Sequence, residues 1–144
     1  MIANITQFSK LEPFIRYNNN KVSAQEATVL DLGGNLFKKE TKYAQYIINA
    51  FGNNVKCSRK DKFLHVSLNF LPADNAVLND AILKDIIGEY LIGIGCDQDH
   101  HYIVYKHDDT IHPHVHIVTS KIDINGKCIT SASNYRKSQM DILT

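Results

Sequence analysis

The chain has 144 residues, of which 44% are hydrophobic and 22% charged, with seven glycines and three prolines. This is the composition of one globular domain, and it excludes collagen-like, low-complexity and disordered chains. The net charge of +1 hides an asymmetry, because residues 1–62 hold ten basic and five acidic residues whereas residues 63–144 hold six and ten. The average charge therefore does not exclude nucleic acid as a partner of the basic half.

The cysteines and the first residues of the chain indicate the cellular compartment in which the protein is expected. Cys57, Cys96 and Cys128 form no C-x-x-C pair, and their odd number argues against a disulfide framework. The first residues lack the basic and apolar regions of a signal peptide, and no apolar run approaches the length of a membrane span. We therefore expect a soluble cytoplasmic protein.

Hydrophobic periodicity and turn residues predict strands alternating with helices. In chain order these are a strand over Met1–Thr6, a helical turn after Ser9 that the run Asn18–Asn20 ends, a strand over Ala27–Leu32, a helix over Lys38–Phe51 with Tyr43 and Tyr46 at core spacing, a strand over Phe63–Phe70, a helix over Asn79–Leu91, paired strands over His101–His107 and His114–Ile122, and a helix over Ser131–Leu143. This order predicts an α+β domain over residues 1–144, whose mostly antiparallel sheet carries helices on one face.

Six of the seven histidines lie between His100 and His116. His114 and His116 are two positions apart on a predicted strand, so both rings point to the same face of the sheet. If the preceding strand returns beside this one, His107 at its end supplies a third nitrogen ligand. Three neutral imidazoles leave coordination positions open, as at a catalytic ion. The sequence therefore predicts a divalent metal ion of the Mn, Mg or Zn class.

Other polar residues are expected to support these ligands. His112 has the same strand parity as His114 and is the alternative third ligand. Asp109 is close enough in sequence to accept a ring N–H and fix a tautomer. His65 lies on the polar face of its own strand, which indicates a residue that supports the ligands or contacts a phosphate. His100 and His101 are expected to be structural.

The segment His107 to Val118, HDDTIHPHVHIV, resembles the three-histidine motif of the mobilization relaxases, which belong to the HUH endonuclease superfamily. Further matching segments are Tyr17-Asn18 with Lys21-Val22, Leu64 to Phe70 and Tyr102 to Tyr105. Together these segments are similar to relaxases from mobile elements of Bacteroidota-type bacteria.

The resemblance implies an antiparallel sheet flanked by helices, and a reaction. In that family a tyrosine hydroxyl attacks one phosphodiester of single-stranded DNA at an origin of transfer, which gives a 5′-phosphotyrosine and a free 3′-OH. The implied partners are this DNA, an accessory mobilization protein and a type IV secretion coupling protein. Because family members usually continue beyond the last predicted helix, we expect the chain to be the N-terminal part of a longer protein.

The resemblance also assigns the nucleophile to Tyr17, which matches the N-terminal Tyr-Asn…Lys pattern and lies in the basic half. A free tyrosine has a pKa of about 10, so it needs a metal ion or a base to attack at neutral pH. Phosphate contacts are expected from basic residues of the same half, namely Arg16, Lys21, Arg59 and Lys60.

Two alternatives stay open at this stage. Replication initiators and transposases of the same superfamily usually place the tyrosine after the histidines, where Tyr135 is the late candidate. A chain that lacks further helices would instead be a catalytically incomplete fragment that binds metal and DNA.

Overall fold

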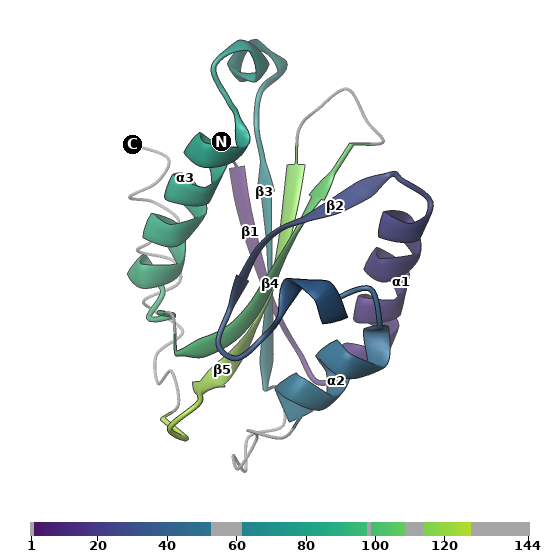
Figure 1. Cartoon of the computed structure of the whole chain (residues 1–144). Helices are drawn as coiled ribbons and strands as arrows, with labels where there is room; N and C mark the ends of the chain where they lie inside the picture. Colours follow the sequence, from purple (N-terminus) through teal and green to yellow (C-terminus); the bar gives the residue numbers. More distant parts are fainter. Residues whose placement is uncertain (1, 53–61, 98, 109–113, 128–144) are drawn as a thin grey trace.

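A computed structural model describes residues 2–52, 62–97, 99–108 and 114–127. Its centre is a five-stranded sheet with the order β1-β3-β5-β4-β2, in which every neighbouring pair is antiparallel (Figure 1). The strands are β1 (Ile2–Phe8), β2 (Ala27–Gly33), β3 (Phe63–Asn69), β4 (His100–His107) and β5 (His114–Asp123). The helices are α1 (Leu11–Ser23), α2 (Ala44–Gly52) and α3 (Asp80–Gly93), with short 3-10 turns η1 (Lys38–Glu40) and η2 (Pro72–Ala76). The predicted α+β class and antiparallel sheet are confirmed.

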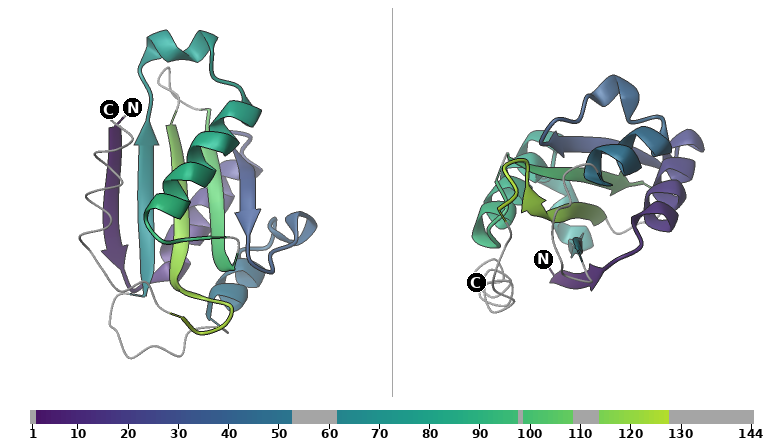
Figure 2. Two further views of the ribbon diagram at one scale, coloured as in Figure 1. Left: turned by 90° about the vertical axis from the view of Figure 1, so that its left-hand side faces the viewer. Right: turned by 90° about the horizontal axis from the view of Figure 1, so that it is seen from below.

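The helices cover both faces of the sheet, so their predicted placement on one face is wrong (Figures 1 and 2). Successive strand residues point to opposite faces, and both sets are apolar over much of the sheet. On β4, Val104 packs in the cluster that contains α3, whereas Ile103 and Tyr105 pack in the cluster that contains α1 and α2. We call these the α3 face and the α1 face. Each apolar face needs its own helical cover.

Helix α1 extends five residues past Asn18, through the asparagines that were expected to end it. Asparagine is a poor residue inside helices because its amide competes for backbone groups, unless that amide has other partners. Asn18 and Asn19 are buried, and both side chains are hydrogen-bonded. Tertiary contacts therefore override the local preference to stop.

The predicted helix over Lys38–Phe51 is divided into η1 and α2. Between them Thr41 is buried, and its hydroxyl donates to the carbonyl of Lys38 across 2.7 Å. The break turns Tyr43 outward, where it is 56% exposed, so its predicted core position is wrong. Tyr46 is partly buried against the α1-face core, as predicted.

Within the described ranges, no helix combines the length and apolar character needed to cross a membrane. The predicted helix over Ser131–Leu143, with Tyr135, lies outside the described residues.

Candidate active site

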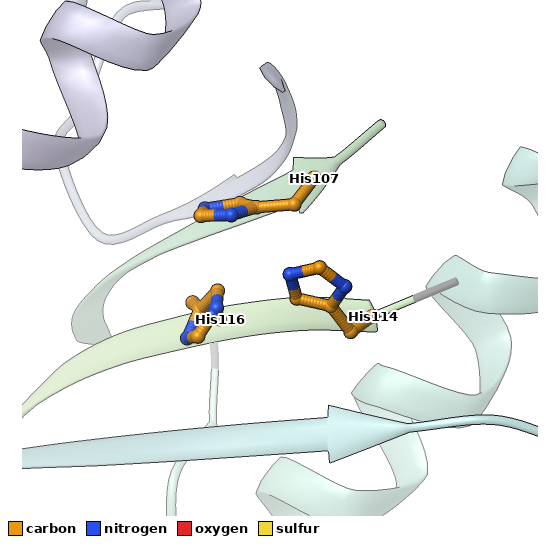
Figure 3. Close-up of side chains that lie close together, drawn as sticks. All are labelled: His107, His114 and His116. Atoms are coloured by element: carbon orange, nitrogen blue, oxygen red, sulfur yellow. The ribbon is translucent and has the colours of Figure 1, made fainter. Parts of the chain in front are cut away.

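Three histidines meet on the α1 face, beside α1 (Figure 3). The antiparallel register places His107, at the end of β4, directly opposite His114, at the start of β5. His116 is two residues further along β5 and lies opposite Tyr105. Each ring offers one nitrogen to a group whose atoms all lie within 4.8 Å of one another, and the ring centroids are 4.3 to 5.3 Å apart. The strands thus bring together the three predicted ligands.

A fourth histidine from β3 contacts this group. Nε2 of His65 lies 2.9 Å from Nδ1 of His116, and the two rings stack with an interplanar angle of 11°. Burial lowers the pKa of His65. The pKa of His116 is lowered to about 3, first by burial and then by the charges of His107, His65, His114 and Lys21. His116 is therefore neutral at neutral pH, which is the form that binds metals.

The orientation of His107 is fixed from α1. The side-chain Nδ2 of Asn18 donates to the carbonyl of Phe14 across 3.0 Å, which turns its Oδ1 toward His107. That oxygen lies 2.8 Å from Nε2 of His107. Because an amide oxygen only accepts, Nε2 carries the proton and the lone pair of this ring is on Nδ1. A metal-binding imidazole is usually oriented in this way, by an oxygen that accepts a hydrogen bond from the ring nitrogen that does not bind the metal.

The donor set fits a divalent cation. Three imidazoles on one face provide three nitrogen ligands and leave the remaining positions of a tetrahedral or octahedral ion open. The neutral state of His116 and the fixed tautomer of His107 both favour binding. Two of the residues predicted to support the ligands, Asp109 and His112, lie outside the described residues.

Tyr17 lies in α1 at the rim of a shallow groove of about 450 Å³. The groove also includes His65, and so reaches the residue that contacts His116. Its remaining walls are mostly apolar and come from Thr6, Phe8, Lys10, Pro13 and Phe14. Tyr17 is 58% exposed, so its hydroxyl is accessible from solvent. The structure thus places the predicted nucleophile and His65 in one groove.

The predicted basic contacts are placed differently from one another. Nζ of Lys21 lies 5.5 Å from the ring centroid of Tyr17, and its charge also acts on His116, so Lys21 lies near both the predicted nucleophile and the cluster. Arg16 instead bonds Glu12 at 2.8 Å and Gln45 at 3.0 Å, which ties α1 to α2. Arg59 and Lys60 lie outside the described residues.

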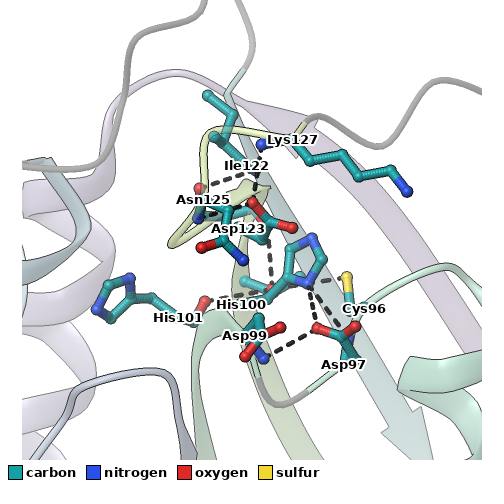
Figure 4. A network of polar contacts seen from close by, with 11 residues as sticks. Cys96, Asp97, Asp99, His100, His101, Ile122, Asp123, Asn125 and Lys127 are labelled. Carbon is teal, nitrogen blue, oxygen red and sulfur yellow. Dashed lines mark hydrogen bonds and ion pairs between the residues drawn. The ribbon is translucent and has the colours of Figure 1, made fainter.

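The remaining two histidines lie at the opposite end of β4 (Figure 4). His100 is 4% exposed, and its Nδ1 lies 3.2 Å from a carboxylate oxygen of Asp97. His101 is also buried, and its carbonyl accepts from Thr119 across 3.3 Å. Both take part in the packing of the strand ends, in agreement with the structural role expected for them.

The sequence did not predict the contacts that Asn19 of α1 makes with the sheet. Asn19 accepts a hydrogen bond from the Tyr105 hydroxyl at 2.8 Å, and both groups are buried. A run of asparagines inside an apolar helical pattern, between Ile15 and Val22, was the available signal. Asparagine favours helix ends and turns, so this run predicts an end at a point where the helix continues.

Comparison with protein-family models gives a match that covers most of the chain. The family model described as "Relaxase: MobA/VirD2-like, nuclease domain" matches residues 17–141, which include Tyr17 and the whole histidine cluster. No curated protein and no solved structure matches the chain.

Proposed function

The chain belongs to the MobA/VirD2-like relaxase nuclease family, whose domains nick DNA, and from this premise we propose that it cuts one strand at an origin of transfer through a covalent tyrosine intermediate. The observation that carries this proposal is the convergence of His107, His114 and His116 beside the groove that contains Tyr17. The Bacteroidota-type subfamily, the accessory mobilization protein and the type IV secretion coupling protein remain predictions from the resemblance.

In the proposed reaction the Tyr17 hydroxyl attacks the scissile phosphorus. A bond forms between the tyrosine oxygen and phosphorus, while the bond from phosphorus to the 3′-oxygen breaks. The tyrosine proton is lost, and the departing 3′-oxygen takes up a proton to become a 3′-OH. The 5′ end of the cut strand stays on Tyr17, so attack by a 3′-OH on the phosphotyrosine reverses the step and rejoins DNA.

His107, His114 and His116 would hold a divalent cation, which when bound supplies positive charge to the non-bridging oxygens of the phosphodiester. His65 positions His116 through their contact at 2.9 Å. Asn18 positions His107 in the same manner. Lys21 adds a fixed positive charge beside the Tyr17 ring, where a phenolate would develop. Residues of the sheet would thus act on the phosphate through the cation, and Lys21 of α1 would stabilise the negative charge on the tyrosine oxygen.

The apolar groove walls suit the nucleotides on either side of the scissile bond. Bases of single-stranded DNA stack on aromatic side chains without sequence preference. Phe8, Phe14 and Tyr17 present such rings, and Lys10 lies at the same groove to contact a phosphate. Binding there would bring a phosphodiester to the Tyr17 hydroxyl.

The test is covalent capture of DNA. Single-stranded fragments that tile the DNA on either side of the gene are incubated with the protein and Mn²⁺, and adducts are detected by denaturing gel shift. We expect an adduct that peptide mass spectrometry maps to Tyr17 and that EDTA prevents. Tyr17→Phe should abolish it, a loss of at least a hundredfold, because the attacking oxygen is absent.

The control is Tyr90→Phe, which removes a tyrosine hydroxyl of α3 that packs in the core of the α3 face, on the other side of the sheet from the groove. It should leave the adduct yield unchanged. An adduct that persists in Tyr17→Phe and disappears in Tyr135→Phe would favour the initiator or transposase alternative. Binding of DNA without any adduct would favour the catalytically incomplete fragment.

A further inference from the structure

The connection between β2 and α2 carries a patch of exposed basic and aromatic side chains that the active site does not use. We call Phe37, Lys38, Lys39, Lys42 and Tyr43 the basic–aromatic patch. All five are exposed, and Phe37 is 71% and Tyr43 56% exposed, which is unusual for such large rings. Glu40 is the one acid in the segment 37–43, so its net charge is +2.

The backbone of the patch is held firmly in place. The N–H of Phe37 donates to the Tyr46 hydroxyl across 2.9 Å, and the hydroxyl of Thr41 donates to the carbonyl of Lys38 across 2.7 Å. Three turn hydrogen bonds, donated by the backbone N–H groups of Glu40, Thr41 and Tyr43, close the segment on itself. The exposed rings and lysines are therefore presented on a preformed surface, which lowers the entropic cost of binding.

The same segment is anchored to the frame of the active site. Nδ2 of Asn19 donates to the Thr41 carbonyl across 2.9 Å, while Oδ1 of Asn19 accepts from the Tyr105 hydroxyl. Asn18, its neighbour in α1, holds His107. Two adjacent asparagines thus fix the patch and the histidine cluster to one helix.

Helix α1 lies between the groove and the patch. Phe14 and Tyr17 of α1 line the groove, whereas Arg16 reaches Gln45 at the start of α2. In Figure 1 the segment between β2 and α2 lies on the side of the sheet that α1 and α2 cover. A strand that left the groove and crossed α1 toward Gln45 would approach the segment that carries the basic–aromatic patch.

We propose that the basic–aromatic patch binds the single-stranded DNA that flanks the nicked phosphodiester. The inference rests on the proposed function, because that function supplies the strand. Lysines neutralise phosphates and exposed rings stack on unpaired bases, and this combination is typical of single-strand binding. Nζ of Lys42 lies 5.1 Å from the ring centroid of Tyr43, so charge and ring are offered together. Paired bases would leave the rings without a stacking partner, so single-stranded DNA is favoured over duplex.

The test measures binding of a fluorescent oligo-dT strand by anisotropy over a range of salt concentrations. This probe needs no nick site. Each phosphate contact to a single strand contributes about 0.7 to the slope of log affinity against log salt. The triple variant Lys38→Ala, Lys39→Ala, Lys42→Ala should lower that slope by about 2 and weaken binding in 0.1 M salt by about a hundredfold.

A charge-matched control keeps this result specific to the patch. The control is the triple variant Lys84→Ala, Lys106→Ala, Lys127→Ala, which removes the same charge elsewhere. Lys84 lies in α3, Lys106 lies in β4 and pairs with Asp80 of α3, and Lys127 follows the end of β5. This control variant should lower the slope by less than about 0.5. The variant Phe37→Ala, Tyr43→Ala should weaken binding at least fivefold with the slope unchanged, because stacking is insensitive to salt.

The outcomes separate the two proposals. Equal slopes for the wild type and the lysine triple variant, in proteins with unchanged circular dichroism, would overturn the patch and leave the proposed function intact. The patch would also be overturned if the lysine triple variant lost affinity only for duplex DNA, or only for an acidic peptide used as a competitor, and bound oligo-dT as the wild type does. A wild-type protein that does not bind oligo-dT would overturn the patch, whereas the proposed function would still be decided by the adduct assay with Tyr17→Phe.

Discussion

Asn18 is a single residue whose amide sets the tautomer of a proposed metal ligand. Asn18→Ala removes the oxygen that accepts from Nε2 of His107. Loss of such a supporting hydrogen bond typically lowers metal affinity by about 10- to 100-fold. We expect a decrease of this size in the affinity for Mn²⁺ or Zn²⁺ measured by titration calorimetry at neutral pH.

Two variants make the Asn18 prediction specific. Asn18→Asp keeps an acceptor oxygen for His107 but loses the amide N–H that donates to the Phe14 carbonyl, so it should bind the cation more tightly than Asn18→Ala does. Asn20→Ala changes an exposed asparagine two residues further along α1 and should have no effect. If Asn18→Ala binds the cation as tightly as the wild type does, the proposed orienting role is wrong.

At the scale of elements, the contact between α1 and β4 depends on a buried hydrogen bond. Tyr105→Phe deletes the hydroxyl that donates to Asn19 and leaves a buried amide oxygen without that donor. Such a loss costs about 1–3 kcal/mol. We expect the free energy of unfolding in urea to fall by about this amount. Burial raises the pKa of Tyr105, so its hydroxyl remains a donor throughout the neutral range.

Tyr90 of α3 is a matched control for this experiment. Like Tyr105 it is 0% exposed, but its hydroxyl has no hydrogen-bond partner among the residues that the structure describes. Deleting an unsatisfied buried hydroxyl removes a penalty instead of an interaction. Tyr90→Phe should therefore leave stability unchanged or raise it. Equal destabilisation by both variants would show that ring packing, and not the Tyr105–Asn19 bond, dominates.

At the scale of the whole molecule, the histidine cluster makes stability depend on pH. The pKa of His116 is about 3 in the folded chain, below the value of 6.5 for an unfolded histidine. Below pH 6.5 the unfolded state gains a proton that the folded state does not take up, so folding weakens progressively toward pH 3. One site contributes at most about 1.4 kcal/mol per pH unit, and the partial exposure of His116 makes its share smaller.

The corresponding measurement is the urea midpoint in EDTA between pH 7.5 and 5. The wild type should lose stability as the pH falls, and His116→Gln should lose less because glutamine does not titrate. The pKa of His65 is lowered by burial, so His65→Gln should flatten the profile in the same direction. Superimposable profiles for all three proteins would contradict this account.

Regular patterns made much of the fold predictable. Alternation along β3 and β5 correctly placed Leu64 and Val115 in the core and His65 and His116 on the other face. The two-residue spacing and the antiparallel return also brought His107 to His114, because strand geometry determines which side chains become neighbours.

What could not be predicted depended on contacts between distant segments. The helices on both faces, the continuation of α1 through its asparagines and the outward turn of Tyr43 follow from tertiary contacts such as that between Asn19 and Thr41. Helix α1 bonds to a β4 residue 89 positions later, and no local pattern contains that information. Tyr17 was selected through resemblance, and its position beside His65 in one groove became visible only in the structure.

The long separation between α1 and the histidine strands has a consequence for when the protein becomes able to cut DNA. Two hydrogen bonds join the helix that carries Tyr17 to the strands that carry the cluster. Asn19 bonds to Tyr105, 86 positions later, and Asn18 bonds to His107, 89 positions later. Such non-local contacts form late in folding because closing long loops costs entropy before any contact compensates for it. During synthesis the tyrosine leaves the ribosome well before His107, His114 and His116 do. A partly made chain therefore holds the proposed nucleophile without the cluster, and under the proposed mechanism it would not nick DNA until the sheet is complete.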